Sequence, residues 1–555
     1  MTLLFTMTLP PLNLITDSWL PVRRRSGAVD CIRPAEVVDS LIDDPVVAFD
    51  WPRADFRIAS IEFLIGLLAT AFPPLDTARW VGLWHEPPSV EILDQAFAHV
   101  AEAFWLDGPG ARFLQDHDDL VSGSEPVERL LIEAPGESTL RRNADLFVHR
   151  GQVAVLGRPA AAMALFTLQA WAPSGGAGNM TGLRGGGPLV SLVLPKEGAS
   201  LWQIAWANTP CGRPAPVDDL ARVFPWLAPT LASGKEGVKV RAEHNAHPLQ
   251  CWWGMPRRIR LDFDEDGSCD LTGRPDAVTV TGWRQRPYGV SYDGWTGMPY
   301  GGGACIHPLT PRYRQKPDSE WLSVHPQPGG IGYRHWVGVV VDSGDGNRLP
   351  ASVVATWRAE RARDAGCARS PRLLAAGFDM DNMKARGFVE SEMPLPGKED
   401  VVFQGKLDGF ARDCVAAADL IASVLRGTVR EALFGNATVS LDATLLAGVR
   451  EQFWAGTSEA FFDLLNSLAE QGVPTIETAR AEWLAVTRRQ AMVRFDAAVQ
   501  LSPDMREAEA MRAAQARRRL RAAVSGFGKE GGTIMQVMNL PLPESKKRTS
   551  VRKRA

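Results

Sequence analysis

Apolar residues recur every three or four positions along four long segments in the last third of the chain. In the first segment, residues 406–434, the apolar stripe consists of Phe410, Cys414, Ala417, Ile421 and Leu425. That spacing places the apolar side chains on one face of a helix. Four such helices with short connections predict a four-helix bundle over residues 398–540. The basic segment 541–555 has no apolar anchor, and we expect it to be a disordered tail.

The pattern in the first two thirds of the chain is mixed. Short β-rich runs occupy residues 189–194, 277–281 and 336–341, and glycine and proline interrupt the sequence between them repeatedly. We therefore expect a large irregular mixed α/β domain over residues 1–397. Together with the helical bundle, this domain gives an α+β fold class for the whole chain.

The longest apolar window, residues 58–72, contains Glu62. It falls short of the roughly 20 residues that a membrane span needs, so it predicts a buried helix. The N-terminus lacks the basic, apolar and small-residue progression of a signal peptide. We expect a cytoplasmic protein without a membrane partner.

The net charge of −3 is unusual for a protein that binds nucleic acid. Such proteins draw much of their affinity from cations that neutralise phosphates, so the positive charge must be local. Basic clusters do occur, and they include Arg257, Arg258 and Arg260, the pair Arg284 and Arg286, and the C-terminal tail. A single cluster is more often a solvated face than a binding site, and a scaffold without nucleic-acid contact is one alternative reading.

Seven cysteines are scattered along the chain without a Cys-x-x-Cys pair, which predicts free thiols and no zinc or other cofactor. No nucleophile elbow and no metal-binding histidine pair is present either, so we predict that the protein is not an enzyme. Asp379 and Asp381 begin a segment similar to a calcium loop, but Lys384 stands where that loop requires glycine. A metal-dependent nuclease using these two aspartates is the second alternative reading.

Residues 174–187 read SGGAGNMTGLRGGG, a run that contains seven glycines and one cation, Arg184. Glycine at this density lets another backbone approach and exposes amide hydrogens, which favours a contact loop for an anion or a nucleic acid. The spacing fits neither a phosphate-binding P-loop nor a dinucleotide fingerprint. The alternative is a flexible surface turn.

This glycine run and two further segments, residues 13–22 and 143–149, together resemble the large subunit of the type I-E CRISPR surveillance complex, Cascade. Three later blocks, residues 252–260, 281–286 and 377–386, are similar to blocks of that family and follow the same order. The resemblance therefore extends over nearly the whole chain.

The resemblance implies which residues contact DNA and RNA. A glycine loop, a basic finger and a wedge at the tip of a hairpin would recognise the protospacer-adjacent motif from the minor groove. The finger would be Arg286, with Arg284 as the competing register, and an arginine would replace the family's lysine. Phe147 and His149 would contact the guide RNA and a neighbouring subunit. The loop and wedge residues implied for DNA binding are Ser174, Gly175, Gly176, Ala177 and Gly178, and Asn382, Met383 and Lys384.

The function implied by the resemblance is that of a non-catalytic Cascade subunit in antiviral defence. Such a subunit recognises the adjacent motif in double-stranded DNA, helps to open the duplex for R-loop formation and recruits the helicase-nuclease. Its partners would be the other Cascade subunits, the guide RNA, the target DNA and that nuclease. Some family members also carry two CxxC pairs, whose positions fall near Gly157, Ala160, Cys269 and Thr272 here, so that one sulfur of four remains.

Overall fold

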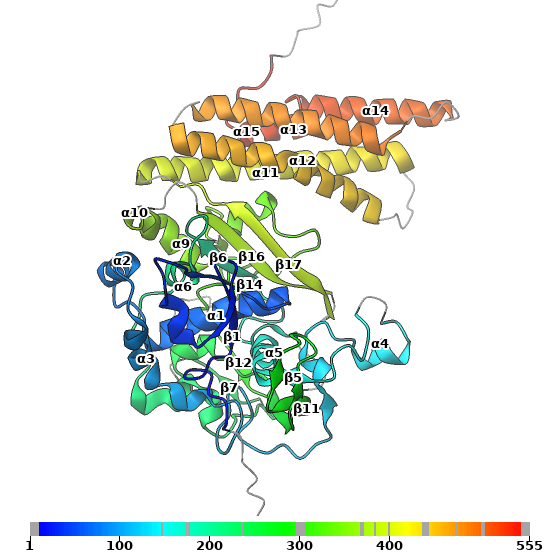
Figure 1. Cartoon of the computed structure of the whole chain (residues 1–555). Coiled ribbons are helices and arrows are strands. Elements are labelled where there is room, and N and C mark those ends of the chain that lie inside the picture. Colours follow the sequence, from blue (N-terminus) through cyan, green and yellow to red (C-terminus); the bar gives the residue numbers. More distant parts are fainter. Residues whose placement is uncertain are drawn as a thin grey trace, which may run out of the picture. The chain divides into compact units, whose positions relative to one another are not determined.

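The computed structural model describes residues 10–145, 148–173, 175, 178–234, 237–242, 244–295, 306–366, 371–381, 384–397, 400–435, 443–471, 475–500 and 506–544. The chain forms two compact units. The first unit comprises residues 1–331 and 338–395, and the second comprises residues 332–337 and 396–555. The first unit mixes helices with small sheets and the second is helical, so the α+β fold class is confirmed (Figure 1).

The core of the first unit is built around helix α1 (Ala54–Ala71), which is buried on nearly every face. Its neighbours are α5 (Arg158–Trp171) and α6 (Leu201–Ala207). The ring of Phe63 on α1 makes edge-to-face contacts with five aromatic rings, those of Trp19, Phe104, Phe113, Phe166 and Trp253. The buried helix predicted from the apolar window is therefore confirmed. No helix in the described part of the chain has the length and apolar character of a membrane span.

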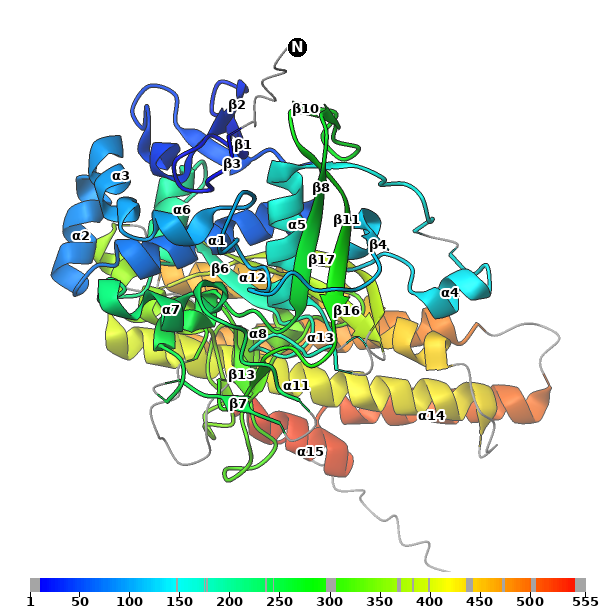
Figure 2. The ribbon, with the colours of Figure 1, turned by 90° about the horizontal axis from the view of Figure 1, so that it is seen from below.

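The described residues of the first unit form six sheets, and three of these contain its longer strands. At the N-terminus, β1 (Leu20–Arg24) lies between β2 (Val29–Ile32) and β3 (Val46–Phe49). In the second sheet, β11 (Thr279–Arg286) pairs with β8 (Arg258–Asp264), β4 (Glu125–Pro126) and β5 (Leu156–Gly157), all antiparallel. The strands β8 and β11 run side by side as a long ribbon (Figure 2).

The third sheet has the order β17-β16-β6 and is antiparallel throughout. Strands β16 (Arg372–Asp381) and β17 (Lys384–Pro394) form a long hairpin, and Asp381 pairs with Lys384 at its tip (Figure 1). Strand β6 (Val190–Leu194) continues directly from the glycine run. Strand β6 lies within the β-rich run predicted at residues 189–194, whereas β11 overlaps the run predicted at 277–281 in three residues and continues to Arg286.

Shorter elements complete the first unit. The helices are α2 (Thr77–His85), α3 (Val90–Ala98), α4 (Glu137–Arg141), α7 (Leu220–Val223), α9 (Ser352–Thr356) and α10 (Ala362–Asp364). The strands are β7 (Lys239–Val240), β9 (Gly267–Ser268), β10 (Pro275–Asp276), β12 (Ser291–Tyr292), β13 (Arg312–Tyr313), β14 (Leu322–Ser323) and β15 (Arg348–Leu349).

The described residues from 396 onward form the four long helices that the apolar stripes predict and one shorter helix. They are α11 (Val401–Phe434), α12 (Ala443–Gln471), α13 (Ile476–Ala498), α14 (Glu507–Ala523) and α15 (Gly528–Val537). Helix α11 contacts the other four, and its predicted stripe is buried. The side chain of Asp400 caps α11 by accepting hydrogen bonds from the amides of Val402 and Phe403.

The prediction of a strand at residues 336–341 is wrong. A 3₁₀ turn (Tyr333–His335) and helix α8 (Trp336–Val339) occupy this region. The segment Gly332–Val337 belongs to the helical unit, where the Trp336 ring contacts Phe461 and Phe462 on α12. A short apolar run does not distinguish a strand from a helix, and these tertiary contacts decide the outcome.

Candidate nucleic-acid interface

The glycine run meets the end of strand β11. Gly178 has a φ of +81°, and an added Cβ would lie 2.6 Å from the Cβ of Pro287 and 2.6 Å from the amide nitrogen of Tyr288. Its carbonyl accepts a hydrogen bond of 2.7 Å from that amide. Only glycine fits this conformation at this distance. The glycine run therefore adjoins the basic finger, because Pro287 directly follows Arg286.

The other end of the run meets the β16–β17 hairpin. Gly187 has a φ of +65°, and an added Cβ would lie 2.7 Å from Cγ of Met380 and 2.9 Å from the carbonyl oxygen of Phe378. The amide of Gly187 donates to the carbonyl of Trp171, 2.7 Å away, at the end of α5. Phe378 itself is buried and contacts Phe388 across the hairpin. One glycine run thus joins the finger strand to the hairpin.

The cation inside the run, Arg184, faces the core. It is 4% exposed, and its Nη2 lies 2.5 Å from Oε1 of Glu62, a residue of α1 that is 1% exposed. Arg184 Nη1 also donates to Oγ1 of Thr310 at 3.2 Å. The adjacent His307 is buried, and burial together with the charge of Arg184 lowers its pKa well below the ordinary value. Arg184 therefore anchors the run to the core. In the sequence, a glutamate inside an apolar helix is the feature that indicates a buried partner of opposite charge, although it does not indicate which residue that is.

The two candidate finger arginines differ in their surroundings. Arg284 lies 2.8 Å from the carboxylate of Asp262 on the neighbouring strand β8. Arg286 is exposed and forms no ion pair among the residues that the structure describes. At the hairpin tip, Lys384 is exposed and likewise has no ion pair with a described residue. Arg386 is engaged, because its Nη2 lies 2.8 Å from Oδ1 of Asp379.

Of the other predicted site residues, two lie in the described part of the chain in local hydrogen-bonded surroundings, and six do not. His149 is exposed, next to an ion pair between Arg150 and Asp145. The hydrogen bond from Arg150 lowers the pKa of Asp145. Gly175 accepts a hydrogen bond at its carbonyl from the side-chain amide of Asn179, at 3.2 Å. Six of the site residues lie outside the described part of the chain, namely Phe147, Ser174, Gly176, Ala177, Asn382 and Met383.

The basic cluster of residues 257–260 is not a free positive patch. Arg258 lies 2.6 Å from Asp116, and Arg260 lies 3.0 Å from Asp119. Arg257 donates from Nη2 to the carbonyl of Pro173, just before the glycine run, and burial lowers its pKa to about 10. The ion pairs and burial of these arginines make the cluster a structural one, neither a solvated face nor a phosphate-binding patch.

A cavity of about 390 Å³ lies where the glycine run, the hairpin and the loop after β14 come together. The run contributes Thr181 and Gly186, and the hairpin contributes Met380 and the ion pair of Asp379 with Arg386. The third wall is the segment His325–Pro328. Sequence reasoning did not single out this segment as part of the site. Its contact with the run follows from the fold and has no local sequence signal.

Comparison with known proteins identifies the family of the chain. The sequence model of the CRISPR-associated protein Cse1 family matches residues 13–493. The chain belongs to the Cse1 family.

Several solved structures share the fold of this Cse1 family member. Cse1 from Thermobifida fusca has a TM-score of 0.68 and 19% identity, over 95% of this chain and 99% of that chain. Cse1 from Acidimicrobium ferrooxidans has a TM-score of 0.63 and 19% identity, over 96% and 99% of the two chains. A chain of a CRISPR RNA-guided surveillance complex has a TM-score of 0.66 and 17% identity, over 93% and 100%.

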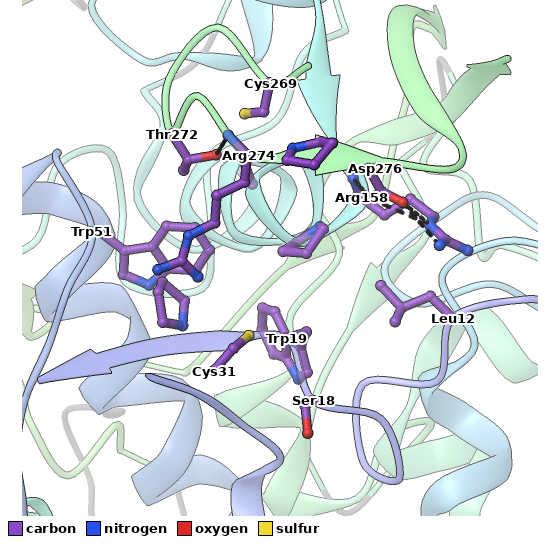
Figure 3. A pocket seen from close by; sticks show the side chains of 15 residues that line it. Leu12, Ser18, Trp19, Cys31, Trp51, Arg158, Cys269, Thr272, Arg274 and Asp276 are labelled. Carbon is purple, nitrogen blue, oxygen red and sulfur yellow. Dashed lines mark hydrogen bonds and ion pairs between the residues drawn. The ribbon is translucent and has the colours of Figure 1, made fainter. Parts of the chain in front are cut away.

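The four positions matched to the CxxC pairs of some Cse1 proteins meet at one cavity of about 400 Å³ (Figure 3). Of these positions only Cys269 carries a thiol, and Cys31, Arg158, Arg274 and Asp276 also line the cavity. The described residues contain no group of three or more His, Cys, Asp or Glu that could hold a metal. Two thiols and a carboxylate that is paired with Arg158 do not make a closed zinc site, which takes four cysteine or histidine ligands.

Restoring the three missing thiols should create a zinc site. A Cβ added at Gly157 would lie 3.4 Å from the Cβ of Cys269, an ordinary contact distance. We expect the triple variant Gly157→Cys, Ala160→Cys and Thr272→Cys to retain about one zinc ion per chain, because four convergent thiolates form a closed tetrahedral site. Elemental analysis of the purified protein measures this, with the wild type as control. A triple variant without zinc would show that the four positions do not converge.

Proposed function

We propose that this Cse1 protein is a non-catalytic subunit of an RNA-guided surveillance complex that reads a short motif in double-stranded DNA from the minor groove. It would act with other subunits and a guide RNA, help to open the duplex beside the target, and recruit a helicase-nuclease. The observation that carries the proposal is the glycine run. It touches the strand end next to Arg286 at Gly178, and at Gly187 it touches strand β16 beside Phe378 and Met380.

The charges of the site support this assignment. Arg286 and Lys384 are exposed and free of ion pairs with described residues, so both can reach phosphates or base edges. Asp262 already neutralises Arg284, which favours Arg286 as the finger. Minor-groove readers combine such cations with close backbone approach and a side chain that separates base steps. Asn382 and Met383, the two residues that connect β16 to β17, are the candidates for that wedge.

The same geometry disfavours the nuclease alternative. Asp379 accepts two hydrogen bonds from Arg386, of 3.0 and 2.8 Å. A carboxylate in a bidentate pair with arginine is held by a cation, and a metal would have to displace that cation. The arginine also places a positive charge at the position that a metal would take.

The test is binding of the assembled guide-RNA complex to a duplex library randomised beside the target. Wild type should enrich a short motif. Arg286→Ala should lose the enriched motif and lower the slope of log affinity against log salt concentration by about one, because the cation proposed to read the motif also neutralises phosphate charge. Arg284→Ala is the matched control on the same strand and should change affinity less than about twofold, since exposed ion pairs contribute little.

The possible outcomes distinguish an error in the assignment of the finger residue from an error in the proposed function. If Arg284→Ala loses the motif and Arg286→Ala keeps it, the finger assignment is wrong while motif reading stands. Binding by wild type that enriches no motif and ignores salt would favour the scaffold reading instead.

A further inference from the structure

His325 has one ring nitrogen fixed by the glycine run. Its Nδ1 lies 3.0 Å from the carbonyl oxygen of Gly187. A carbonyl can only accept a hydrogen bond, so Nδ1 carries the hydrogen in this contact. In the neutral imidazole the other nitrogen, Nε2, then has no hydrogen and is an acceptor. The fold thus selects one tautomer of this side chain.

The accepting nitrogen lies beside the glycine run. Nε2 makes no hydrogen bond with any residue that the structure describes, and His325 is half-buried. Nε2 lies 4.0 Å from the position that a Cβ on Gly185 would take, so the missing side chain of Gly185 leaves space beside the ring. The charged groups that share its cavity are Asp379 and Arg386, and they are paired with each other.

An acceptor at this position has a specific chemical consequence. In the minor groove, A·T and T·A pairs present only acceptors, and the 2-amino group of guanine is the single donor. An acceptor that faces the groove therefore favours a G·C pair and disfavours an A·T pair. We propose that His325 is a specificity-determining residue whose Nε2 accepts a hydrogen bond from a guanine 2-amino group in the recognised motif. The proposal rests on the minor-groove function proposed above.

Inosine provides the chemical test, because it pairs with cytosine but lacks the 2-amino group. The assembled guide-RNA complex is titrated with duplexes in which each G·C pair of the enriched motif is replaced singly by inosine·C. Wild type should lose roughly threefold to tenfold in affinity at one position, as expected for one hydrogen bond. His325→Asn is the informative variant, since its Nδ2 can still donate to the carbonyl of Gly187 while its acceptor, Oδ1, takes the place of Cδ2 and does not reach the position of Nε2.

In His325→Asn, inosine at that position should no longer change the affinity. Its effect on affinity at the other positions should stay as in wild type. His325→Ala should give the same result, and it replaces the asparagine variant if thermal melting shows that the latter is unfolded. A variant that keeps the wild-type penalty overturns the proposal, and so does a wild type that is indifferent to inosine everywhere in its motif. If wild type enriches no motif at all, the proposed function fails first, so the two failures are distinguishable.

Discussion

Replacing Arg184 by methionine should lower the free energy of unfolding of the first unit by about 3–5 kcal/mol, the usual cost of breaking a buried ion pair. Its partner Glu62 also accepts a hydrogen bond from the indole of Trp171, at 3.2 Å, but that donor is neutral. Without Arg184 a carboxylate that is 1% exposed stays in the core, and its remaining ionisable neighbour is His307, whose Nε2 lies 3.6 Å from Oε1 of Glu62 and whose pKa is lowered by burial. Urea denaturation followed by tryptophan fluorescence measures the loss.

The double variant Glu62→Leu and Arg184→Met is the control. Removing both charges together replaces a buried ion pair by apolar groups, which is often neutral for stability. We expect the double variant to regain most of the stability that Arg184→Met loses. A double variant as unstable as the single one would show that Arg184 acts through packing alone. The double variant also tests whether the glycine run stays packed against the core when the ion pair between Glu62 and Arg184 is absent.

The sequence predicted the helices of the second unit well because their signal is local. The apolar stripe of α11 repeats over many turns, and Asp400 and Thr475 cap α11 and α13 as hydrogen-bond acceptors. Helix α1 was equally clear as a continuous apolar window. The run at residues 336–341 carried no such periodic information, and its outcome depends on aromatic partners more than 100 residues later, such as Phe461.

The candidate site was predicted only in part, for the same reason. The glycine run and the arginines next to strand β11 are visible in the sequence, but their contact at Gly178 and Tyr288 is not. Charge was the least predictable property. Arg258 appears in the sequence as part of a basic cluster, whereas its partner Asp116 lies 142 residues away. The role of Arg184 depends on Glu62, 122 residues earlier.

Replacing Tyr333 by alanine should destabilise the helical unit by about 3–5 kcal/mol, the range for truncating a large buried aromatic side chain. The ring of Tyr333 is 1% exposed and stacks on Phe461, with centroids 4.6 Å apart. It also meets the rings of Trp454 and Trp483, at 5.0 and 5.7 Å. Because this segment comes from a distant part of the chain, the variant also tests whether the helices alone complete their core.

Hydrogen exchange of amides in α12 and α13 measures this effect, since each 1.4 kcal/mol of lost stability accelerates exchange through global opening about tenfold. Tyr333→Phe separates the ring from the hydroxyl, which lies 2.6 Å from Oγ1 of Thr457. That oxygen also donates to the carbonyl of Phe453, at 2.9 Å, so removing the tyrosine hydroxyl leaves it with a partner. We expect a cost of only about 1 kcal/mol for Tyr333→Phe. Unchanged exchange in α12 and α13 of Tyr333→Ala would mean that the helical unit holds together without this segment.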